Sequence, residues 1–189
     1  MRLFIAVEIS SEIQNLIDQF ISDAKKFPQF QKGTKWGKSG NFHLTLKFMG
    51  EIEENKVETL KEALSRSVKG QEKFCLEFKG IGAFPNLDRP RVLWIGVEEN
   101  ISQLMKLANL VEKETVESGF SKSDKPFSAH LTLARFSFPP QPSYLESLKP
   151  VQNISFGKLY VDRISLIQSI LQPAGAEHQP LDEFIFTEN

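Results

Sequence analysis

The 189-residue sequence predicts an α+β protein built from two similar halves. The first observation is the tetrapeptide His-Leu-Thr-Leu, which occurs at residues 43–46 and again at residues 130–133. The chain has only three histidines, and two of them begin these copies. The second observation is that predicted strands and helices follow a similar order around each copy. We therefore interpret the chain as an internal repeat within a single domain, residues 1–189.

The first half begins with a short apolar run, residues 3–9, which predicts a buried strand. Ser11 followed by Gln14 has the spacing of a helix N-terminal capping box. Apolar residues then recur at intervals of three and four, which predicts a helix of about four turns packed on a sheet. These residues are Ile13, Leu16, Ile17, Phe20, Ile21 and Ala24.

Residues 31–40 are polar and contain glycine, so we expect a connection with Trp36 as its apolar anchor. The first tetrapeptide follows as a strand. Residues 53–68 predict the second helix, and Gly70 lies just past its end, where a left-handed residue is expected.

Residues 73–79 alternate apolar and charged side chains, which predicts a strand with one solvated face. The glycine- and proline-containing residues 81–90 predict a loop. Residues 92–97 are apolar on both faces, as in a central strand. A third helix is expected between Asn100 and Gly119.

The second tetrapeptide is again predicted to be a strand. A proline-rich break at residues 139–142 separates it from a short predicted helix at residues 144–148. Three strands complete the chain, at residues 154–160, 163–171 and 183–187.

The composition excludes several classes of protein. A net charge of −1 argues against a protein that covers long stretches of nucleic-acid backbone, but it permits a local pocket for one nucleotide. The single cysteine, Cys75, excludes an intramolecular disulfide. The N-terminal apolar run is too short for a signal peptide, and no run could span a bilayer, so we expect a cytoplasmic protein that does not bind membranes.

Each tetrapeptide, as a strand, presents a histidine and a threonine on one face. In the first copy these are His43 and Thr45. The apolar floor on the opposite face is expected to contain Phe42, Leu44, Leu46 and Phe48.

In the second copy His130 and Thr132 share a face, above Leu131 and Leu133. Strict alternation places Arg135 on the leucine face. Its guanidinium, which matches phosphate oxygens well, reaches the histidine only if the strand bends, bulges or ends near Ala134.

Two imidazoles and two hydroxyls that converge on one volume suit the hydrolysis of a phosphodiester. One histidine accepts a proton from water, and the other donates a proton to the leaving oxygen. The hydroxyls hold the charged phosphate oxygens. His-x-Thr is not a metal-ligand spacing, and no cluster of other ligands accompanies it, so we expect neither a metal nor a cofactor.

Two further residues need an interpretation. Phe84 either stacks on a nucleobase or anchors its loop to the core. His178 lies in a turn-rich stretch, and we expect it to be solvated and without a role.

The chain resembles the RNA 2′,3′-cyclic phosphodiesterases of the 2H phosphoesterase superfamily, also described as 2′-5′ RNA ligases. The resemblance rests on the paired His-x-Thr-x motifs and their surroundings. The matching segments are residues 2–7, 42–48, 82–85, 91–97 and 130–135, with Leu171 and residues 175–176. Two departures are Ala129, where proline is common, and His178, where many members have tyrosine.

The resemblance implies a LigT-like, bilobal α+β fold with pseudo-twofold symmetry, antiparallel sheets flanked by helices, and a central cleft. It also implies metal-independent hydrolysis of a terminal RNA 2′,3′-cyclic phosphate to a 2′-phosphate. By analogy His43 is the proton donor and His130 the proton acceptor, although the sequence does not distinguish these labels. Thr45, Thr132 and Arg135 would bind the phosphate.

The expected partners are RNA ends with a 2′,3′-cyclic phosphate, such as tRNA fragments, or cyclic nucleotides. The protein is expected to be a monomer. The alternative functions are the reverse reaction, 2′-5′ ligation of RNA ends, and a non-catalytic module that binds RNA ends.

Overall fold

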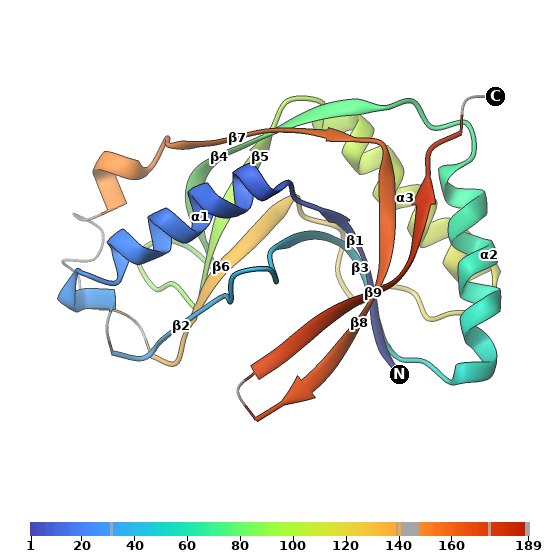
Figure 1. Ribbon diagram of the computed structural model, residues 1–189, viewed down its shortest axis with the longest axis horizontal. Helices are drawn as coiled ribbons and strands as arrows, with labels where there is room; N and C mark the ends of the chain where they lie inside the picture. Colours follow the sequence, from blue (N-terminus) through green and yellow to red (C-terminus); the bar gives the residue numbers. More distant parts are fainter. Residues whose placement is uncertain (31, 139, 141–147, 174, 188–189) are drawn as a thin grey trace.

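The computed structural model describes residues 1–30, 32–138, 140, 148–173 and 175–187. Its described part contains two antiparallel sheets (Figure 1). The first sheet consists, in spatial order, of β3 (His43–Glu51), β1 (Arg2–Glu8), β8 (Arg163–Gln172) and β9 (Gly175–Ile185). The second consists of β2 (Thr34–Trp36), β6 (His130–Phe136), β5 (Val92–Glu98), β4 (Phe74–Phe84) and β7 (Ser155–Val161).

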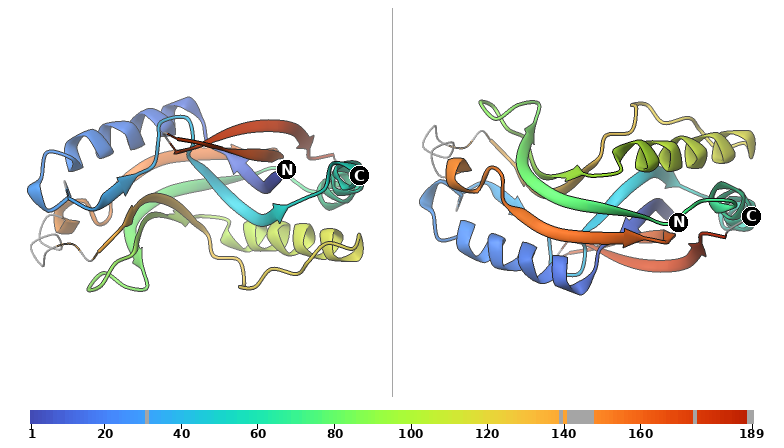
Figure 2. Two further views of the ribbon diagram at one scale, coloured as in Figure 1. Left: turned by 90° about the horizontal axis from the view of Figure 1, so that it is seen from below. Right: turned by 90° about the horizontal axis from the view of Figure 1, so that it is seen from above.

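Among the described residues, three α-helices cover these sheets at opposite ends of the molecule (Figures 1 and 2). The helices are α1 (Ser11–Ala24), α2 (Val57–Val68) and α3 (Ile101–Glu117). Helix α1 packs on β7 of the second sheet, whereas α2 and α3 pack on each other and on the first sheet. The predicted α+β fold class is therefore confirmed.

The internal repeat is visible in the connectivity. In the first half the chain runs through β1, α1, the short strand β2 and β3, and β3 pairs antiparallel with β1. In the second half the chain runs through β5, α3 and β6, and β6 pairs antiparallel with β5. Each histidine-bearing strand therefore pairs with the strand that precedes its helix.

Helix α1 shows how local sequence produces its element. Ser10, one residue before the predicted cap, extends its backbone and accepts a hydrogen bond from the Ile13 backbone N–H at 3.4 Å. The buried stripe follows the predicted spacing, although Leu16 is 48% exposed. Its buried residues are Ile13, Ile17, Ile21 and Ala24.

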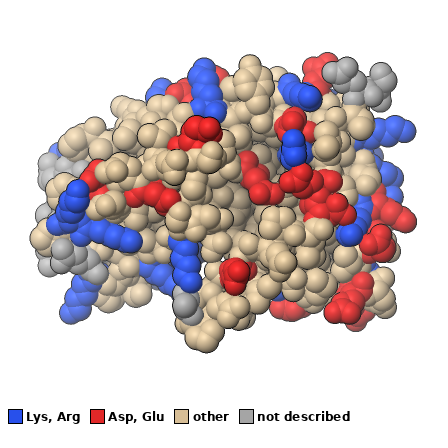
Figure 3. All heavy atoms as spheres, viewed as in Figure 1, with Lys and Arg blue, Asp and Glu red and all other residues tan. Residues whose placement is uncertain are grey.

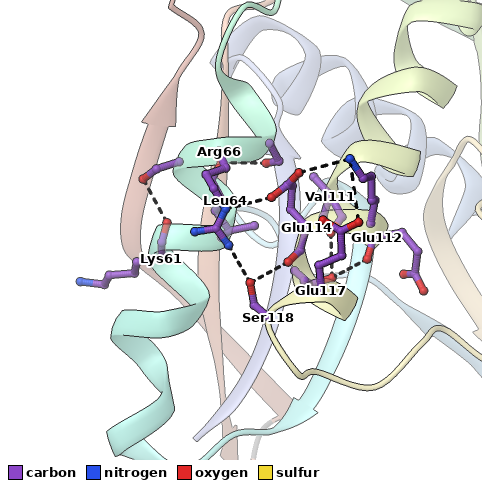
Figure 4. A network of polar contacts seen from close by, with 12 residues as sticks. Lys61, Leu64, Arg66, Val111, Glu112, Glu114, Glu117 and Ser118 are labelled. Carbon is purple, nitrogen blue, oxygen red and sulfur yellow. Dashed lines mark hydrogen bonds and ion pairs between the residues drawn. The ribbon is translucent and has the colours of Figure 1, made fainter.

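Helices α2 and α3 are joined by polar contacts outside the apolar core. Arg66 on α2 donates to Glu114 on α3 at 2.9 Å and to Ser118, the residue just after α3, at 2.7 Å (Figure 4). Beneath them, one cluster of buried apolar residues draws on both sheets and all three helices. None of the helices in the described part of the chain is long and apolar enough to cross a membrane.

Residues 85–90 form a loop as predicted, but the predicted start of that loop at residue 81 was wrong, because β4 continues to Phe84. Gly82 is not a turn residue here: a Cβ on it would lie 2.1 Å from the Trp94 ring. The glycine lets the indole lie against β4. The loop prediction therefore mistook a site of close packing for a chain reversal.

Two other elements differ from prediction. The connection at residues 31–40 contains a short edge strand, β2, whose Trp36 packs near Phe30 with ring centroids 5.7 Å apart. The last strand, β9, begins at Gly175 rather than at residue 183. The predicted helix at residues 144–148 falls, apart from Leu148, outside the described residues.

Candidate active site

Strand β3 places His43 and Thr45 on one face and Leu44 on the other, as predicted. Both polar residues are half-buried, and Leu44 is fully buried. A β-bulge follows, because Thr45 pairs with Ala6 and the next paired residue is Lys47. The extra residue, Leu46, is also buried and completes the apolar floor.

The bulge reverses the side-chain alternation after Leu46. Phe48 therefore lies opposite Phe4, is 70% exposed, and has its ring centroid 6.0 Å from that of Phe4. The prediction that Phe48 belongs to the buried floor was wrong, since it assumed an unbroken strand.

Strand β6 repeats this geometry. His130 and Thr132 are half-buried on one face above the fully buried Leu131 and Leu133. A bulge again falls on the fourth residue of the motif, because Trp94 pairs with Thr132 whereas Leu93 pairs with Ala134.

The bulge in β6 decides the position of Arg135. It returns the exposed Arg135 to the face of His130 and Thr132, which is the condition that the sequence left open. The guanidinium is close enough to help lower the pKa of His130. Arg135 therefore lies with the second motif.

The two histidine strands meet between the sheets, where β3 packs against β6. A pocket of about 360 Å³ opens beside the second motif, and its lining includes Trp94, Gly96 and Ala129. The structure thus brings both motifs to one region of the molecule, as the internal repeat predicts.

The His43 ring lies in an apolar and aromatic environment. It stacks on Phe4 with centroids 4.6 Å apart. Burial, with a contribution from the positive charge of His178, lowers the pKa of His43 to about 4, although a hydrogen bond to the backbone of Asn41 acts in the opposite direction. In this environment the neutral imidazole predominates at pH 7.

His178 is not the solvated loop residue that the sequence suggested. It lies on β9, and its ring meets that of His43 edge-on at 4.8 Å and that of Phe4 at 5.0 Å. The start of β9 is held there by the Asn41 side chain, which donates to the Ala176 carbonyl at 2.9 Å. Burial lowers the pKa of His178 as well.

His130 is more exposed than His43 and is held by its own strand entrance. Its Nδ1 lies 2.8 Å from the Ser128 carbonyl, which can only accept, so Nδ1 carries a proton and Nε2 is the free atom of the neutral ring. Burial lowers the pKa of His130, the Ser128 hydrogen bond raises it, and the Arg135 charge lowers it.

Phe84 lies beside the second motif rather than away from it. Its ring meets that of His130 edge-on at 4.9 Å and lies 5.4 Å from that of Trp94. The side chain is half-buried, so part of the ring remains accessible. Within the described residues there is no group of three or more His, Cys, Asp or Glu that could hold a metal ion.

Sequence reasoning missed three neighbours of the histidines: Phe4, Trp94 and His178. Phe4 and Trp94 lie in runs that are apolar on both faces, so nothing marked the face that each ring occupies. His178 needed the length and path of β9, which its turn-forming neighbours concealed.

Comparison with known proteins agrees with this geometry. A family model described as LigT like phosphoesterase matches the chain twice in succession, over residues 7–94 and 95–176. The chain belongs to the LigT-like phosphoesterase family. The paired match is also what an internal repeat of two halves requires.

Other members of this family are similar over nearly their whole length. An RNA 2′,3′-cyclic phosphodiesterase of Archaeoglobus fulgidus is 36% identical over 97% of this chain and 99% of its own. One of Thermotoga maritima is 35% identical over 98% and 96%. The crystal structure of Escherichia coli LigT complexed with 3′-AMP has a TM-score of 0.76 at 27% identity, covering 98% of each chain.

Proposed function

We propose that this protein hydrolyses the 2′,3′-cyclic phosphate at the end of an RNA to a 2′-phosphate. The observation that carries the proposal is the pair of identically bulged strands, each with a histidine and a threonine on the exposed face. The relatives named above as RNA 2′,3′-cyclic phosphodiesterases support the substrate class. The 3′-AMP complex of Escherichia coli LigT supports a nucleotide ligand.

In the proposed reaction, water attacks the phosphorus and the bond from phosphorus to the 3′ oxygen breaks. His130 accepts the proton of the attacking water through Nε2, which is free because Nδ1 is bonded to Ser128. His43 donates a proton to the departing 3′ oxygen. The products are a 2′-phosphate and a free 3′-hydroxyl.

The remaining side chains hold the substrate. Thr45 and Thr132 bind the non-bridging oxygens, where charge is held through the transition state. Arg135 adds a fixed positive charge on the same face. Phe84, beside His130, stacks on the base of the terminal nucleotide.

The low pKa of His43 places a condition on this assignment. A proton donor must be protonated, yet burial lowers the pKa of His43 to about 4 without substrate. An anionic phosphate next to the ring raises that pKa, since an opposite charge favours the protonated form. His43 would therefore become a donor when the cyclic phosphate binds.

We also propose that no metal ion takes part, because the two histidines and the phosphate ligands account for each proton and charge in the reaction. The test is turnover of an RNA oligonucleotide with a 2′,3′-cyclic phosphate in excess chelator, with the product assigned by phosphorus NMR. A 2′-phosphate is the expected product. Loss of turnover that added metal restores would contradict the metal-free mechanism.

The same assay separates the alternatives. Binding of the oligonucleotide without turnover would identify a binding module instead. Appearance of 2′-5′-linked RNA when a 5′-hydroxyl oligonucleotide is added would show that the reverse reaction, ligation, also occurs.

A further inference from the structure

A row of four side chains crosses the second sheet next to the second motif. Lys35 on β2 is the direct antiparallel partner of Arg135 on β6. Arg135 is in turn paired with Val92 on β5, and Val92 with Phe84 on β4. Directly paired residues of an antiparallel sheet project from the same face, so Lys35 lies on the face that carries Arg135 and His130.

Lys35 and Arg135 form an unusual pair. Both are exposed, and like charges directly opposite each other destabilise a sheet. Among the residues that the structure describes, neither has an ion pair or a side-chain hydrogen bond. By contrast, Lys79 on β4 and Lys158 on the opposite edge strand β7 are paired with Glu98 and Glu99.

The row runs from the neighbourhood of His130 outward to the edge strand of the sheet. Arg135 acts on the pKa of His130, and Lys35 lies one strand further out, on the edge strand. Neighbouring strands are about 4.8 Å apart, so the backbone of Lys35 lies roughly that distance beyond Arg135, on the side away from β5. At its other end the row reaches Phe84, whose ring touches that of His130.

On the face drawn in Figure 3, basic side chains gather on the left, where Figure 1 draws β2 and α1. Acidic side chains are more frequent on the right, over the end of the molecule that carries α2. A chain with a net charge of −1 therefore keeps local positive charge next to its edge strand.

We propose that Lys35, together with Arg135, binds the phosphate on the 5′ side of the terminal nucleotide, so that the preferred substrate is an oligonucleotide rather than a cyclic mononucleotide. This inference rests on the proposed function. The base of the terminal nucleotide lies against Phe84, its cyclic phosphate lies between the histidines, and the next phosphate reaches the edge strand. The phosphate can be an internucleotide diester or a free 5′-phosphate, since both carry the recognised charge.

The test compares wild type with Lys35→Met, which keeps the aliphatic stem and removes the charge. Three substrates are used: a 2′,3′-cyclic nucleoside monophosphate, the same compound with a 5′-phosphate, and a dinucleotide with a 2′,3′-cyclic end. Lys113→Met, at an exposed lysine of α3, is the matched control. Thermal unfolding checks that both variants fold.

Lys35→Met should lower kcat/KM for the dinucleotide about tenfold, mainly through KM, and leave the cyclic mononucleotide unchanged. The slope of log kcat/KM against log salt should become shallower by about 0.7 for the dinucleotide. An equal fall in kcat/KM for the dinucleotide and the cyclic mononucleotide without a 5′-phosphate would overturn the proposal. So would no fall for any of the three substrates. A fall for the 5′-phosphorylated mononucleotide but not for the dinucleotide would assign the site to a free 5′-phosphate and overturn the oligonucleotide preference.

Turnover of the cyclic mononucleotide by wild type tests the proposed function separately. Calorimetric binding of a dinucleotide and a mononucleotide that each end in a 2′-phosphate requires no turnover. Lys35→Met should weaken the first about tenfold and leave the second unchanged. This arm decides the inference even if the enzyme does not turn over the cyclic substrates.

Discussion

Strands β3 and β6 begin with the same four residues and share the same local geometry, yet they place their histidines in different surroundings. Both strands bulge at the fourth residue of the motif, Leu46 or Leu133. Each histidine is also hydrogen bonded to the backbone of the residue two positions earlier, Asn41 or Ser128.

The differences begin just after the bulge. The first strand continues with the buried Lys47 and the exposed Phe48, whereas the second continues with the buried Ala134 and the exposed Arg135. Both histidines lie against aromatic rings, Phe4 and His178 beside His43 and Phe84 and Trp94 beside His130, but only the more exposed His130 has a cation, Arg135, on its face.

This contrast shows how a duplicated motif can supply two unlike groups. The backbone fixes where each imidazole lies, and the neighbouring side chains set its pKa. Environments that separate the pKa values of two titratable groups are typical of acid and base pairs.

Removing either histidine should be equally damaging if the two motifs form one site. We expect His43→Ala and His130→Ala each to lower kcat at least about 10²-fold on a cyclic-phosphate oligonucleotide. The double variant should lose less than the product of the two, because the residues act together. A variant with near-wild-type kcat would remove its histidine from the mechanism.

The burial of His43 should make stability depend on pH. The pKa is about 4 in the folded protein and 6.5 in the unfolded chain, so the unfolded state binds more protons between these values. The contribution of His43 to the free energy of unfolding should fall by about 3 kcal/mol as the pH decreases from 6.5 to 4, on the linkage of 1.36 kcal/mol per pKa unit.

Urea unfolding at a series of pH values measures this slope. His43→Gln should remove most of it, whereas His130→Gln should remove less, because the His130 ring is more exposed. If His43→Gln left the dependence of unfolding free energy on pH unchanged, the low pKa of the buried His43 ring would be contradicted.

Lys47 is the counterpart of Ala134 and makes the first strand depend on α3. Its buried ammonium donates to Thr115 at 2.8 Å and lies 2.9 Å from Glu112, which also accepts from Ser123. Lys47→Met should cost about 2 kcal/mol of unfolding free energy, because it leaves Glu112 partly buried without its cation.

The matched control for Lys47→Met is Lys61→Met, at a more exposed lysine that also has two ion pairs. It should cost less than about 1 kcal/mol. If urea unfolding gave the same loss of unfolding free energy for Lys47→Met and Lys61→Met, the burial of Lys47 would contribute no additional stability.

The smallest effect concerns His178, which distinguishes the surroundings of His43 from those of His130. His178→Phe keeps a ring against Phe4 and removes the positive charge that lowers the pKa of His43. The pKa of His43, followed by NMR titration, should therefore rise. The pKa of His130 should not change, and a parallel change in both would indicate a general rearrangement.

The features of the fold and of the candidate site that depend on local sequence pattern could be predicted from the sequence. Repetition, alternation and cap residues predicted two halves, the main helices and the faces of His43, Thr45, His130 and Thr132. The position of Arg135 could not be predicted, because a bulge is a property of the pairing between strands and leaves no mark in one strand alone. The equivalent bulge in β3 explains the error for Phe48.

Long-range geometry accounts for the remaining differences. His178 reaches His43 because it lies on β9, and the start of β9 is held by a hydrogen bond between Asn41 and Ala176, which are 135 positions apart in the chain. Gly82 was interpreted as a loop residue because its role depends on the Trp94 ring. Neither contact has a local signature.

The most direct test of the two histidine roles uses a substrate in which sulfur replaces the 3′ oxygen of the cyclic phosphate. A thiol has a pKa near 8.5, so the sulfur leaves as a thiolate without a proton donor. This substrate should restore His43→Ala to within about tenfold of wild type, while His130→Ala stays at least about 10²-fold slower. Restoration of His130→Ala instead would reverse the assignment, and restoration of neither would contradict the acid and base pair.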